Sequence, residues 1–287
     1  MLMAPVRYVR PDSVGDALEA LEGEDGARVL AGGQSLVNAL KLRAARVELL
    51  VDITRLAELS EISLEPDGTL VVGAAVTYVE VERSADVARA LPLLQHIAAH
   101  LVDRQVRNRG TVGGNCCLND PLSNLPPLFV AIGARFRIAG RDGLREVDAD
   151  DFFTGPYQTA VRHGELLHSV VVPPLAPDTG LGYQSLQLGA ESWALARAAV
   201  CLVGDPISSA RVVLGCIGPR PLRQPDAEER LIGRRRADVD LQEVERATAV
   251  GIRAFGDVHA SGKYRLAMAK TVAGRAVAQA IGTEGTA

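Results

Sequence analysis

The stretch that decides the fold reads Arg107-Asn108-Arg109-Gly110-Thr111-Val112-Gly113-Gly114-Asn115 and continues Cys116-Cys117-Leu118-Asn119-Asp120-Pro121. Three glycines stand within five residues, so this backbone has no Cβ atoms to hold a ligand away. Successive N–H groups in such a turn can form a concave anion site, and Thr111 and Asn115 add side-chain donors at its edges. Taken alone, the stretch is more often an ordinary tight turn.

A second glycine turn lies about eighty residues upstream and reads Leu30-Ala31-Gly32-Gly33-Gln34-Ser35-Leu36. It follows a short apolar run at 27–31 that predicts a buried strand, and a helix is expected over 36–44 with Ser35 near its start. N–H groups at such a helix start favour an anion. We interpret the two turns as binding one diphosphate between them.

Length and composition place the chain among soluble globular proteins of two domains. The chain has 287 residues, of which 47% are hydrophobic and 23% charged. A net charge of −4 argues against nucleic acid as a main partner. No apolar run approaches the length of a transmembrane helix, and residues 1–7 lack the layout of a signal peptide. We therefore expect a cytoplasmic protein.

The four cysteines are Cys116, Cys117, Cys201 and Cys216, and none has a CxxC spacing. Zinc and iron–sulfur sites need several thiolates at workable spacings, so no metal site is predicted. Reduced and mostly buried thiols are expected. The alternative is that Cys116 or Cys117 lines a cofactor pocket, because both directly follow Asn115.

Two polar clusters leave alternatives open. His96 and His100 are four residues apart on a predicted helix, a spacing that can bind zinc, but no HExxH pattern accompanies them and a solvent-facing or capping role is expected. The three arginines of 104–109 are equally compatible with a phosphate contact and with salt bridges.

The hydrophobic pattern predicts an α+β chain. Residues 27–31, 36–44 and 47–53 form a β-α-β lobe, and 173–182, rich in Pro, Gly and Asp, is the expected domain boundary. An antiparallel meander of three strands (183–188, 194–203 and 210–216) and helices at 226–231, 241–255 and 263–281 follow. Elsewhere, helices are expected at 12–22, 56–62, 79–90, 92–102 and 124–133, and strands at 70–76, 134–138 and 166–172.

The two glycine motifs, with Lys41-Leu42-Arg43 after the first and Asp120-Pro121 after the second, resemble the FAD-binding medium subunit of molybdenum hydroxylases, the family of carbon monoxide dehydrogenase and bacterial xanthine dehydrogenase. The resemblance covers nearly the whole chain, including Tyr8-Val9-Arg10-Pro11 and Ser261-Gly262-Lys263-Tyr264-Arg265. It implies a two-lobed PCMH-type FAD-binding domain at 1–175, with lobes of about 1–55 and 56–175, and a C-terminal α+β domain of the CO dehydrogenase flavoprotein type at 180–287.

The resemblance also implies a set of cofactor-binding residues. The FAD diphosphate is expected between the two glycine turns, Asp120 and Ser123 near the ribityl or ribose hydroxyls, and Leu166 and Leu167 beside the adenine or the ring. The implied set is Leu30, Ala31, Gly32, Gly33, Gln34, Ser35, Leu36, Lys41, Thr111, Gly113, Gly114, Asn115, Asp120, Ser123, Asn124, Leu166 and Leu167. No catalytic residue and no metal ligand is expected.

Members of this family accept electrons from iron–sulfur clusters on a small subunit, supplied by a molybdopterin large subunit, and pass them through FAD to an external acceptor. The resemblance therefore implies both partner chains. The alternatives are a stand-alone FAD-dependent oxidoreductase, for which a homo-oligomer is the expected assembly, and a binding protein that has lost FAD. No nucleophile–base pair is evident, which favours chemistry carried by the cofactor.

Three positions depart from the family pattern. Asn124 stands where the family usually has an aspartate, and Arg46-Val47 stands where a proline is usual. Residues 184–191, at the start of the C-terminal sheet, lack the usual lysine and arginine. These departures predict weaker FAD binding than in a typical member.

Overall fold

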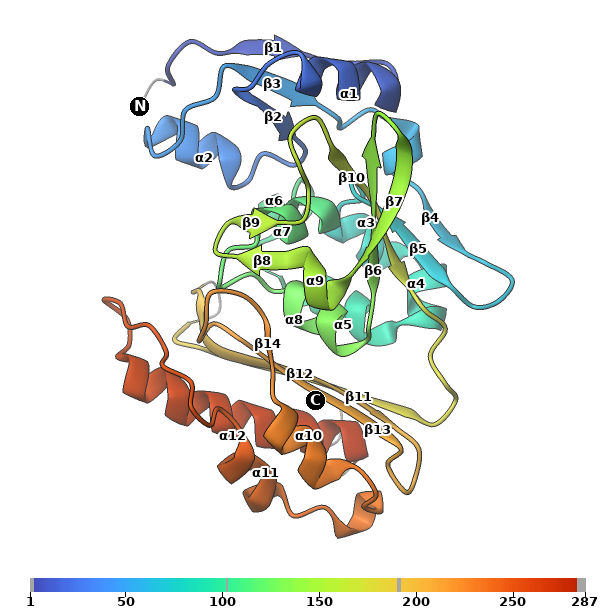
Figure 1. Ribbon diagram of the computed structural model, residues 1–287, viewed down its shortest axis with the longest axis vertical. Coiled ribbons are helices and arrows are strands. Elements are labelled where there is room, and N and C mark those ends of the chain that lie inside the picture. Colours follow the sequence, from blue (N-terminus) through green and yellow to red (C-terminus); the bar gives the residue numbers. More distant parts are fainter. Residues whose placement is uncertain (1–2, 102, 190–191, 283–287) are drawn as a thin grey trace. The chain divides into compact units, whose positions relative to one another are not determined.

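The computed structural model describes residues 3–101, 103–189 and 192–282, and its chain is α+β, as predicted. Contacts divide it into two compact units (Figure 1). The first unit comprises Met1–Leu118, Arg135–Thr154 and Gln158–Val172. The second comprises Asn119–Ala134, Gly155–Tyr157 and Pro173–Ala287. Residues 119–134 and 155–157 thus cluster with the C-terminal part of the chain. Each unit is described by itself.

The first unit begins with a parallel three-stranded sheet in the order β1-β3-β2. Its strands are β1 (Arg7–Val9), β2 (Ala27–Leu30) and β3 (Leu49–Asp52). All four residues of β3 are buried, as expected for a central parallel strand with both faces covered. Helix α1 (Val14–Glu22) packs Val14, Ala17 and Leu21 into the same core cluster as Val51. Helix α2 (Leu36–Lys41) contributes to a separate cluster around Leu50.

The predicted β-α-β lobe is present, with one correction to its helix. Helix α2 ends at Lys41 rather than Ala44, because Arg43 adopts a φ of +57°, outside the right-handed helical region. Ser13 caps α1 by accepting a hydrogen bond from the Asp16 N–H. Ser35 precedes α2 but makes no side-chain capping bond.

The rest of the first unit is built on an antiparallel sheet in the order β4-β5-β10-β6-β7. Its core includes a cluster of three phenylalanine rings, in which Phe136 stacks on Phe152 at 3.9 Å and Phe153 meets both edge-on. The strands are β4 (Ile62–Leu64), β5 (Leu70–Gly73), β6 (Arg135–Gly140), β7 (Gly143–Asp148) and β10 (Leu166–Val172). Smaller elements of this region are η1 (Ala57–Leu59), α9 (Ala149–Phe152), β8 (Phe153–Gly155) and β9 (Gln158–Thr159).

Four short helices lead from β5 to the second glycine turn, and a fifth begins inside that turn. They are α3 (Tyr78–Arg83), α4 (Ala85–Ala90), α5 (Pro92–His100), α6 (Arg104–Arg107) and α7 (Val112–Leu118). The single helix predicted over 79–90 is wrong, because Ser84 has extended backbone angles and caps a new helix by accepting from the Val87 N–H. The predicted end of the next helix, residue 102, lies outside the described residues.

The second unit contains an antiparallel sheet in the order β11-β12-β13-β14. The strands are β11 (Thr179–Gln187), β12 (Ala194–Val203), β13 (Ser209–Gly215) and β14 (Leu222–Arg223). The helices are α8 (Pro126–Ala131), α10 (Pro225–Leu231), η2 (Arg236–Asp238), α11 (Leu241–Ala247) and α12 (Gly262–Ile281). The sheet has four strands rather than the predicted three, and β11 begins inside the predicted linker. The helix predicted over 241–255 ends at Ala247.

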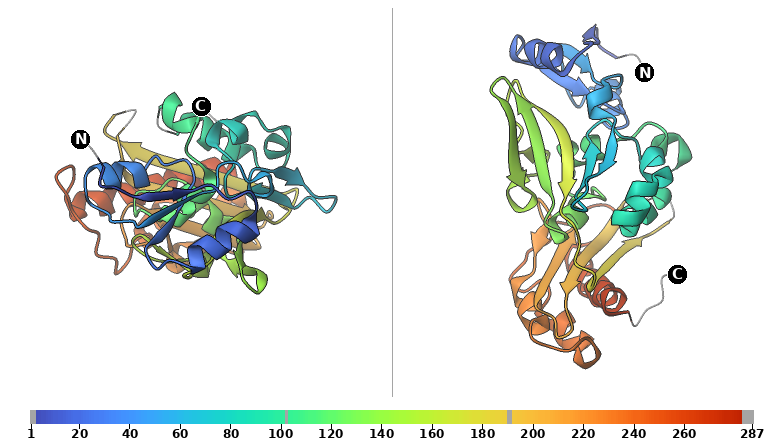
Figure 2. Two further views of the ribbon diagram at one scale, coloured as in Figure 1. Left: turned by 90° about the horizontal axis from the view of Figure 1, so that it is seen from above. Right: turned by 90° about the vertical axis from the view of Figure 1, so that its right-hand side faces the viewer.

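Both faces of this sheet are covered, which explains why nine of the ten residues of β12 are buried. Along β12, alternate residues Ala196, Ala198, Val200 and Leu202 share one core cluster with the helices α10, α11 and α12. Helix α12 (red) runs along β11 and β12 (Figures 1 and 2). It lies close, since a Cβ on Gly182 would stand 1.8 Å from the Ala276 carbonyl. The other face packs on α8.

No helix within the described residues is long and apolar enough to cross a membrane.

Candidate functional site

The two glycine turns meet inside the first unit. A Cβ on Gly32 would lie 2.0 Å from the carbonyl oxygen of Arg109 and 2.9 Å from the Cα of Gly110. Real Cβ atoms do not approach a carbonyl so closely, so only glycine fits at position 32. Turns far apart in sequence therefore lie side by side, and a diphosphate bound between them stays a prediction.

The first turn presents a row of open backbone donors. Gly33 has a φ of +72°, which turns the chain sharply after β2. The turn is held through its carbonyls, since the Gln34 side-chain amide donates to Gly32 O at 3.0 Å and the Asn38 amide donates to Gln34 O at 2.7 Å. Within the described chain, the N–H groups of 32–36 have no intramolecular acceptor. This donor set fits the oxygens of a diphosphate.

The second turn differs from the expectation that its N–H groups also form an anion site. Gly113 donates to the Ala74 carbonyl at 3.0 Å, and Gly114 donates to the Thr111 hydroxyl oxygen at 2.9 Å. The N–H groups of Gly110, Val112 and Asn115 are also used, by the carbonyls of Val106, Val76 and Thr111. The physical reason is that helix α7 starts at Val112, so these donors close its first turn or bond its neighbours.

The polar groups of Thr111 remain available from this turn. In the part of the chain that the structure describes, the Thr111 N–H has no acceptor, and its hydroxyl accepts from Gly114 while keeping its own proton to donate. Asn115 is partly exposed, and its backbone N–H donates to the Thr111 carbonyl. The two turns therefore differ. The first turn offers a row of backbone N–H groups, and the second turn offers a surface with a few side-chain donors.

Gly113 and Gly114 serve packing rather than unusual backbone angles. Neither has a positive φ. A Cβ on Gly113 would lie 2.5 Å from the Ala74 carbonyl oxygen, whereas one on Gly114 would meet only the Thr111 hydroxyl oxygen, at 2.8 Å. Gly113 therefore sets the distance between α7 and β5, and Gly114 leaves open the surface beside Thr111.

The three arginines before the second turn have different surroundings. Arg107 is partly buried and donates to the Leu101 carbonyl at 3.3 Å, with Glu82 4.0 Å from its Nε. Arg104 and Arg109 are exposed, and neither guanidinium has a hydrogen-bond or ion-pair partner among the described residues. Of the two interpretations of these arginines, pairing within the chain therefore applies to Arg107 only.

The remaining predicted residues of the first unit lie on its surface or in its core. Leu30 ends β2 and Ala31 follows it, both partly buried. Lys41 is exposed at the end of α2. Leu166 and Leu167 are buried in β10, with Leu166 in the core cluster that contains Val51.

The carboxyl end of the parallel sheet carries a buried carboxylate. Asp52 accepts hydrogen bonds from the Tyr8 hydroxyl at 2.5 Å, the Thr54 N–H at 2.9 Å and the Thr54 hydroxyl at 2.7 Å. Burial raises the pKa of Asp52, but these hydrogen bonds outweigh it and hold the pKa below its usual value. Asp52 therefore braces the strand end that adjoins the first glycine turn.

In the second unit, residues 119–124 fold around Asp120. Its carboxylate accepts from the Leu122 N–H at 2.8 Å and from the Tyr157 hydroxyl at 3.0 Å, and its carbonyl accepts from the Ser123 N–H at 2.7 Å. Asp120 is partly buried and Ser123 is buried. The loop is thus pre-shaped by its own side chain.

Arg197 is the residue of this unit that the sequence analysis missed. Its guanidinium is buried and donates to the carbonyls of Leu122 and Ser123, each at 2.8 Å, and to the side-chain oxygen of Asn124. The signal was present in the sequence, because Arg197 is the one charged residue of the otherwise apolar stretch 194–203. Such a cation needs several partners when it is buried.

The four cysteines and the two histidines of α5 were singled out in the sequence as candidate pocket or metal residues. All four thiols are free; Cys116, Cys201 and Cys216 are buried, whereas Cys117 is exposed on α7. His96 and His100 are exposed on α5, and the His100 Nδ1 lies 2.8 Å from the His96 carbonyl oxygen. No group of three or more potential metal ligands occurs in the residues that the structure describes.

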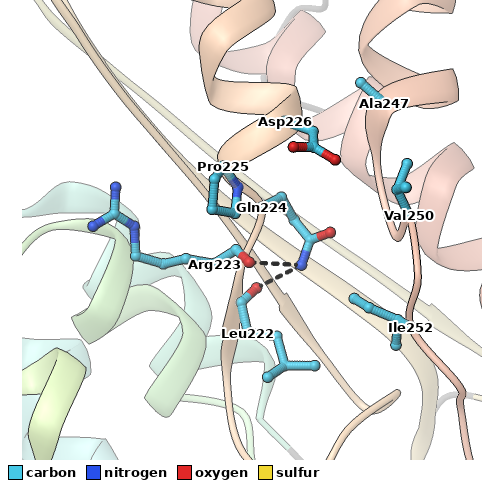
Figure 3. Close-up of a pocket in the computed structure, with 8 residues that line it drawn as sticks. All are labelled: Leu222, Arg223, Gln224, Pro225, Asp226, Ala247, Val250 and Ile252. Carbon is cyan, nitrogen blue, oxygen red and sulfur yellow. Dashed lines mark hydrogen bonds between the residues drawn. The ribbon is translucent and has the colours of Figure 1, made fainter.

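A pocket of about 210 Å³ lies in the second unit, away from all predicted site residues in sequence (Figure 3). Its buried polar group is Gln224, whose amide nitrogen donates to the carbonyls of Leu222 and Arg223 at 3.0 Å. The Gln224 oxygen accepts from the Ala249 N–H at 2.8 Å. These partners are all backbone groups of the chain, so the Gln224 amide is used to hold the fold.

Comparison with known proteins identifies the class of both halves. Residues 4–175 match the FAD binding domain in molybdopterin dehydrogenase, and residues 182–280 match the CO dehydrogenase flavoprotein C-terminal domain. The protein is thus an FAD-binding oxidoreductase component. The chain belongs to the family of FAD-binding medium subunits of molybdenum hydroxylases.

Relatives of similar length support this assignment. The carbon monoxide dehydrogenase medium chain of Hydrogenophaga pseudoflava is 37% identical, over 96% of this chain and 97% of the relative. The glyceraldehyde dehydrogenase medium chain of Sulfolobus acidocaldarius is 33% identical, over 92% of this chain and 94% of the relative.

Solved structures agree. A chain of the carbon monoxide dehydrogenase from Hydrogenophaga pseudoflava that lacks the Mo-pyranopterin moiety superposes with a TM-score of 0.93 at 36% identity, covering 98% of both chains. A chain of quinoline 2-oxidoreductase from Pseudomonas putida 86 superposes with a TM-score of 0.91 at 31% identity, again over 98% of both chains.

Proposed function

We propose that this subunit receives electrons from iron–sulfur clusters on a small partner subunit and passes them through FAD to an external acceptor. A molybdopterin large subunit would supply these electrons by oxidising the substrate. The proposal is supported by relatives that are named medium chains and that match over nearly their whole length. We also propose a cytoplasmic location, where thiols such as its four free cysteines stay reduced.

The placement of the cofactor is supported by the N–H groups of residues 32–36. They have no acceptor within the described chain and lie beside Arg109. We propose that the FAD diphosphate lies against this row, with Thr111 and Asn115 contributing from the second turn. Gly113 and Gly114 carry no side chain, so the second turn can approach the cofactor closely. The other proposed contacts are those implied by the family resemblance: Leu30, Ala31, Lys41, Asp120, Ser123, Asn124, Leu166 and Leu167.

Bound FAD supplies a redox centre that accepts and releases electrons, which no side chain of the protein provides. The role of the chain is to bind and orient this group. Backbone N–H groups suit the diphosphate because they are fixed in position and cannot be lost by titration. The exposed guanidinium of Arg109, next to the turn, adds favourable positive charge.

Ligand binding to the apo chain tests the placement. FAD and ADP should bind measurably, and FMN and riboflavin should bind much more weakly, because neither carries a diphosphate. Equal affinity for FMN and FAD would contradict the placement at the glycine turns. Failure to bind FAD at all would instead favour a binding protein that has lost the cofactor.

Purification from the native host tests the electron-transfer role. We expect a yellow complex that contains one FAD per copy of this chain together with an iron–sulfur chain and a molybdopterin chain. Addition of the substrate of the complex should bleach the flavin absorbance only when both partners are present. A yellow chain that purifies alone and turns over substrate would support the stand-alone oxidoreductase instead.

A further inference from the structure

We propose that Arg197 is a positioning residue for the cofactor: its guanidinium holds the oxygen of the Asn124 side-chain amide, so that the amide nitrogen is the group left to bond FAD. This role rests on the proposed contact between Asn124 and FAD. Arg197 lies on β12 in the second unit and belongs to neither glycine motif.

Arg197 projects from the face of β12 that packs on α8. Its neighbours Ala196 and Ala198 belong to the core cluster on the opposite face, because side chains alternate along a strand. Gly215 pairs with Arg197 across the sheet. A Cβ on Gly215 would lie 2.8 Å from the Cγ atom of Pro127 and 3.6 Å from the Cβ of Arg197. The missing side chain at 215 therefore leaves room for the start of α8 beside Arg197.

The two terminal nitrogens of Arg197 serve different partners. Nη1 donates to the carbonyls of Leu122 and Ser123, each at 2.8 Å, and to the sulfur of Cys216 at 3.4 Å. Nη2 donates to the side-chain oxygen of Asn124. The first nitrogen thus fixes the chain before residue 124, and the second acts on the Asn124 side chain.

The chemistry of the guanidinium determines which end of the amide faces it. A guanidinium carries only donors and an amide accepts through its oxygen, so the Asn124 oxygen lies against Arg197 and the nitrogen is directed away from it. Asn124 is partly exposed, and its amide nitrogen has no acceptor within the part of the chain that the structure describes. Two N–H donors therefore remain for a ligand.

The main chain at residue 124 is fixed from both neighbours of β12. The Tyr183 hydroxyl, from β11, donates to the Asn124 carbonyl at 2.9 Å. The Cys216 N–H, directly after β13, donates to the Pro121 carbonyl at 3.1 Å. With the backbone held in this way, rotation of the Asn124 side chain is the freedom that Arg197 removes.

A fixed and polarised amide is a better donor than a freely rotating one. Less conformational entropy is lost on binding when the side chain already has its bound orientation. The bond from Arg197 is also charge-assisted, and hydrogen bonds in a chain polarise one another, which strengthens the donors on the amide nitrogen. We therefore expect Arg197 to act on FAD through Asn124.

Arg197→Lys separates the two roles of this side chain. Lysine has one nitrogen with three donors, which can bond the carbonyls that Nη1 bonds, but it has no second nitrogen for Asn124. We expect the FAD dissociation constant of the full chain, measured by flavin fluorescence, to rise about five- to tenfold, the effect of one hydrogen bond. The variant that combines Arg197→Lys with Asn124→Ala should bind like Asn124→Ala alone.

Arg265 offers a matched control, because it is also 1% exposed and lies in the same unit. Its Nη1 donates to the carbonyls of Leu195 and Cys216, at 3.0 and 3.3 Å, and its Nη2 donates to the Asp257 carboxylate at 2.6 Å. Arg265→Lys thus makes the same chemical change at a residue with no hydrogen bond to Asn124. It should lower the urea midpoint and leave FAD affinity unchanged. An equal loss of FAD affinity in both lysine variants would overturn the positioning role.

NMR of the wild-type chain provides a measurement that does not depend on any variant folding. The side-chain amide resonances of Asn124 should shift when FAD is added. An unshifted amide, wild-type affinity in Arg197→Lys, or additive effects of the two substitutions would each overturn the role of Arg197 while leaving FAD binding itself intact. A wild-type chain that binds no FAD would overturn the proposed placement and this inference together.

Discussion

The guanidinium of Arg197 donates a hydrogen bond to the side-chain oxygen of Asn124. Arg197 is 1% exposed, and its other hydrogen-bond partners are the carbonyls of Leu122 and Ser123 and the thiol of Cys216. No carboxylate pairs with this buried cation among the described residues. Because Arg197 already uses the Asn124 amide oxygen, the proposed contact of Asn124 with the cofactor would come from its amide nitrogen.

Replacement of Asn124 by aspartate should stabilise the fold. A carboxylate would give Arg197 a charged partner in place of a neutral one, worth about 1 kcal/mol after the cost of burying part of the new charge. Urea unfolding at neutral pH should show this gain, and Asn124→Ala should show a loss. A less stable Asn124→Asp variant would mean that desolvation of the new carboxylate outweighs its attraction to Arg197.

Gly32→Ala should separate the two glycine turns. Its Cβ would overlap the Arg109 carbonyl at 2.0 Å, and both partners are backbone, so the clash cannot be relieved by a side-chain rotation. We expect FAD affinity to fall at least tenfold, measured by titration of the apo chain. Gly15→Ala is the control, because the nearest atom is 3.6 Å away and α1 gains an alanine; its stability should stay equal or rise slightly.

Gly113→Ala and Gly114→Ala should affect different properties. Alanine at 113 meets the Ala74 backbone at 2.5 Å, so we expect a loss of roughly 1–3 kcal/mol in unfolding free energy. Alanine at 114 meets only the Thr111 hydroxyl oxygen, and the gain in helix propensity offsets part of the cost. Gly114→Ala should therefore unfold at nearly the wild-type urea concentration but bind FAD more weakly. Wild-type FAD affinity in this variant would show that position 114 does not face the cofactor.

The ion pair of Arg145 and Glu165 should make stability pH-dependent. Arg145 contacts both Glu165 oxygens, at 2.9 and 2.7 Å, and these bonds hold the pKa of Glu165 below its ordinary value of 4.5. A lowered folded-state pKa stabilises the protein above the ordinary value, and this contribution is lost as the pH falls through the folded pKa. Glu165→Gln should thus be about 1–2 kcal/mol less stable at neutral pH.

The difference between wild type and Glu165→Gln should shrink as the pH falls below 4.5, in urea unfolding followed by circular dichroism. The neighbouring pair Arg137–Glu146, which is more exposed at Glu146, provides a comparison; Glu146→Gln should change stability less at every pH. A constant difference between wild type and Glu165→Gln across this range would show that the Arg145 contact does not depend on the carboxylate charge.

The sequence by itself determined the α+β class, most strands and the meeting of two glycine turns. These are local or repetitive signals: the apolar run of β3 and the glycines at positions where no Cβ fits. The motif pair also carried the family resemblance. Boundaries were less accurate, because the end of α2 depends on the left-handed Arg43 and the break at Ser84 on a cap inside an otherwise helical pattern.

The tertiary structure determines which backbone N–H groups are left without an intramolecular acceptor. The sequence presents the N–H groups of both glycine turns alike, yet those of 112–115 are consumed by α7 and its neighbours while those of 32–36 stay open. Likewise, Arg197 meets Asn124 across a separation that no local pattern encodes. Hydrogen bonding saturates each donor once, so the choice of partner depends on which chain segments the folded core brings together.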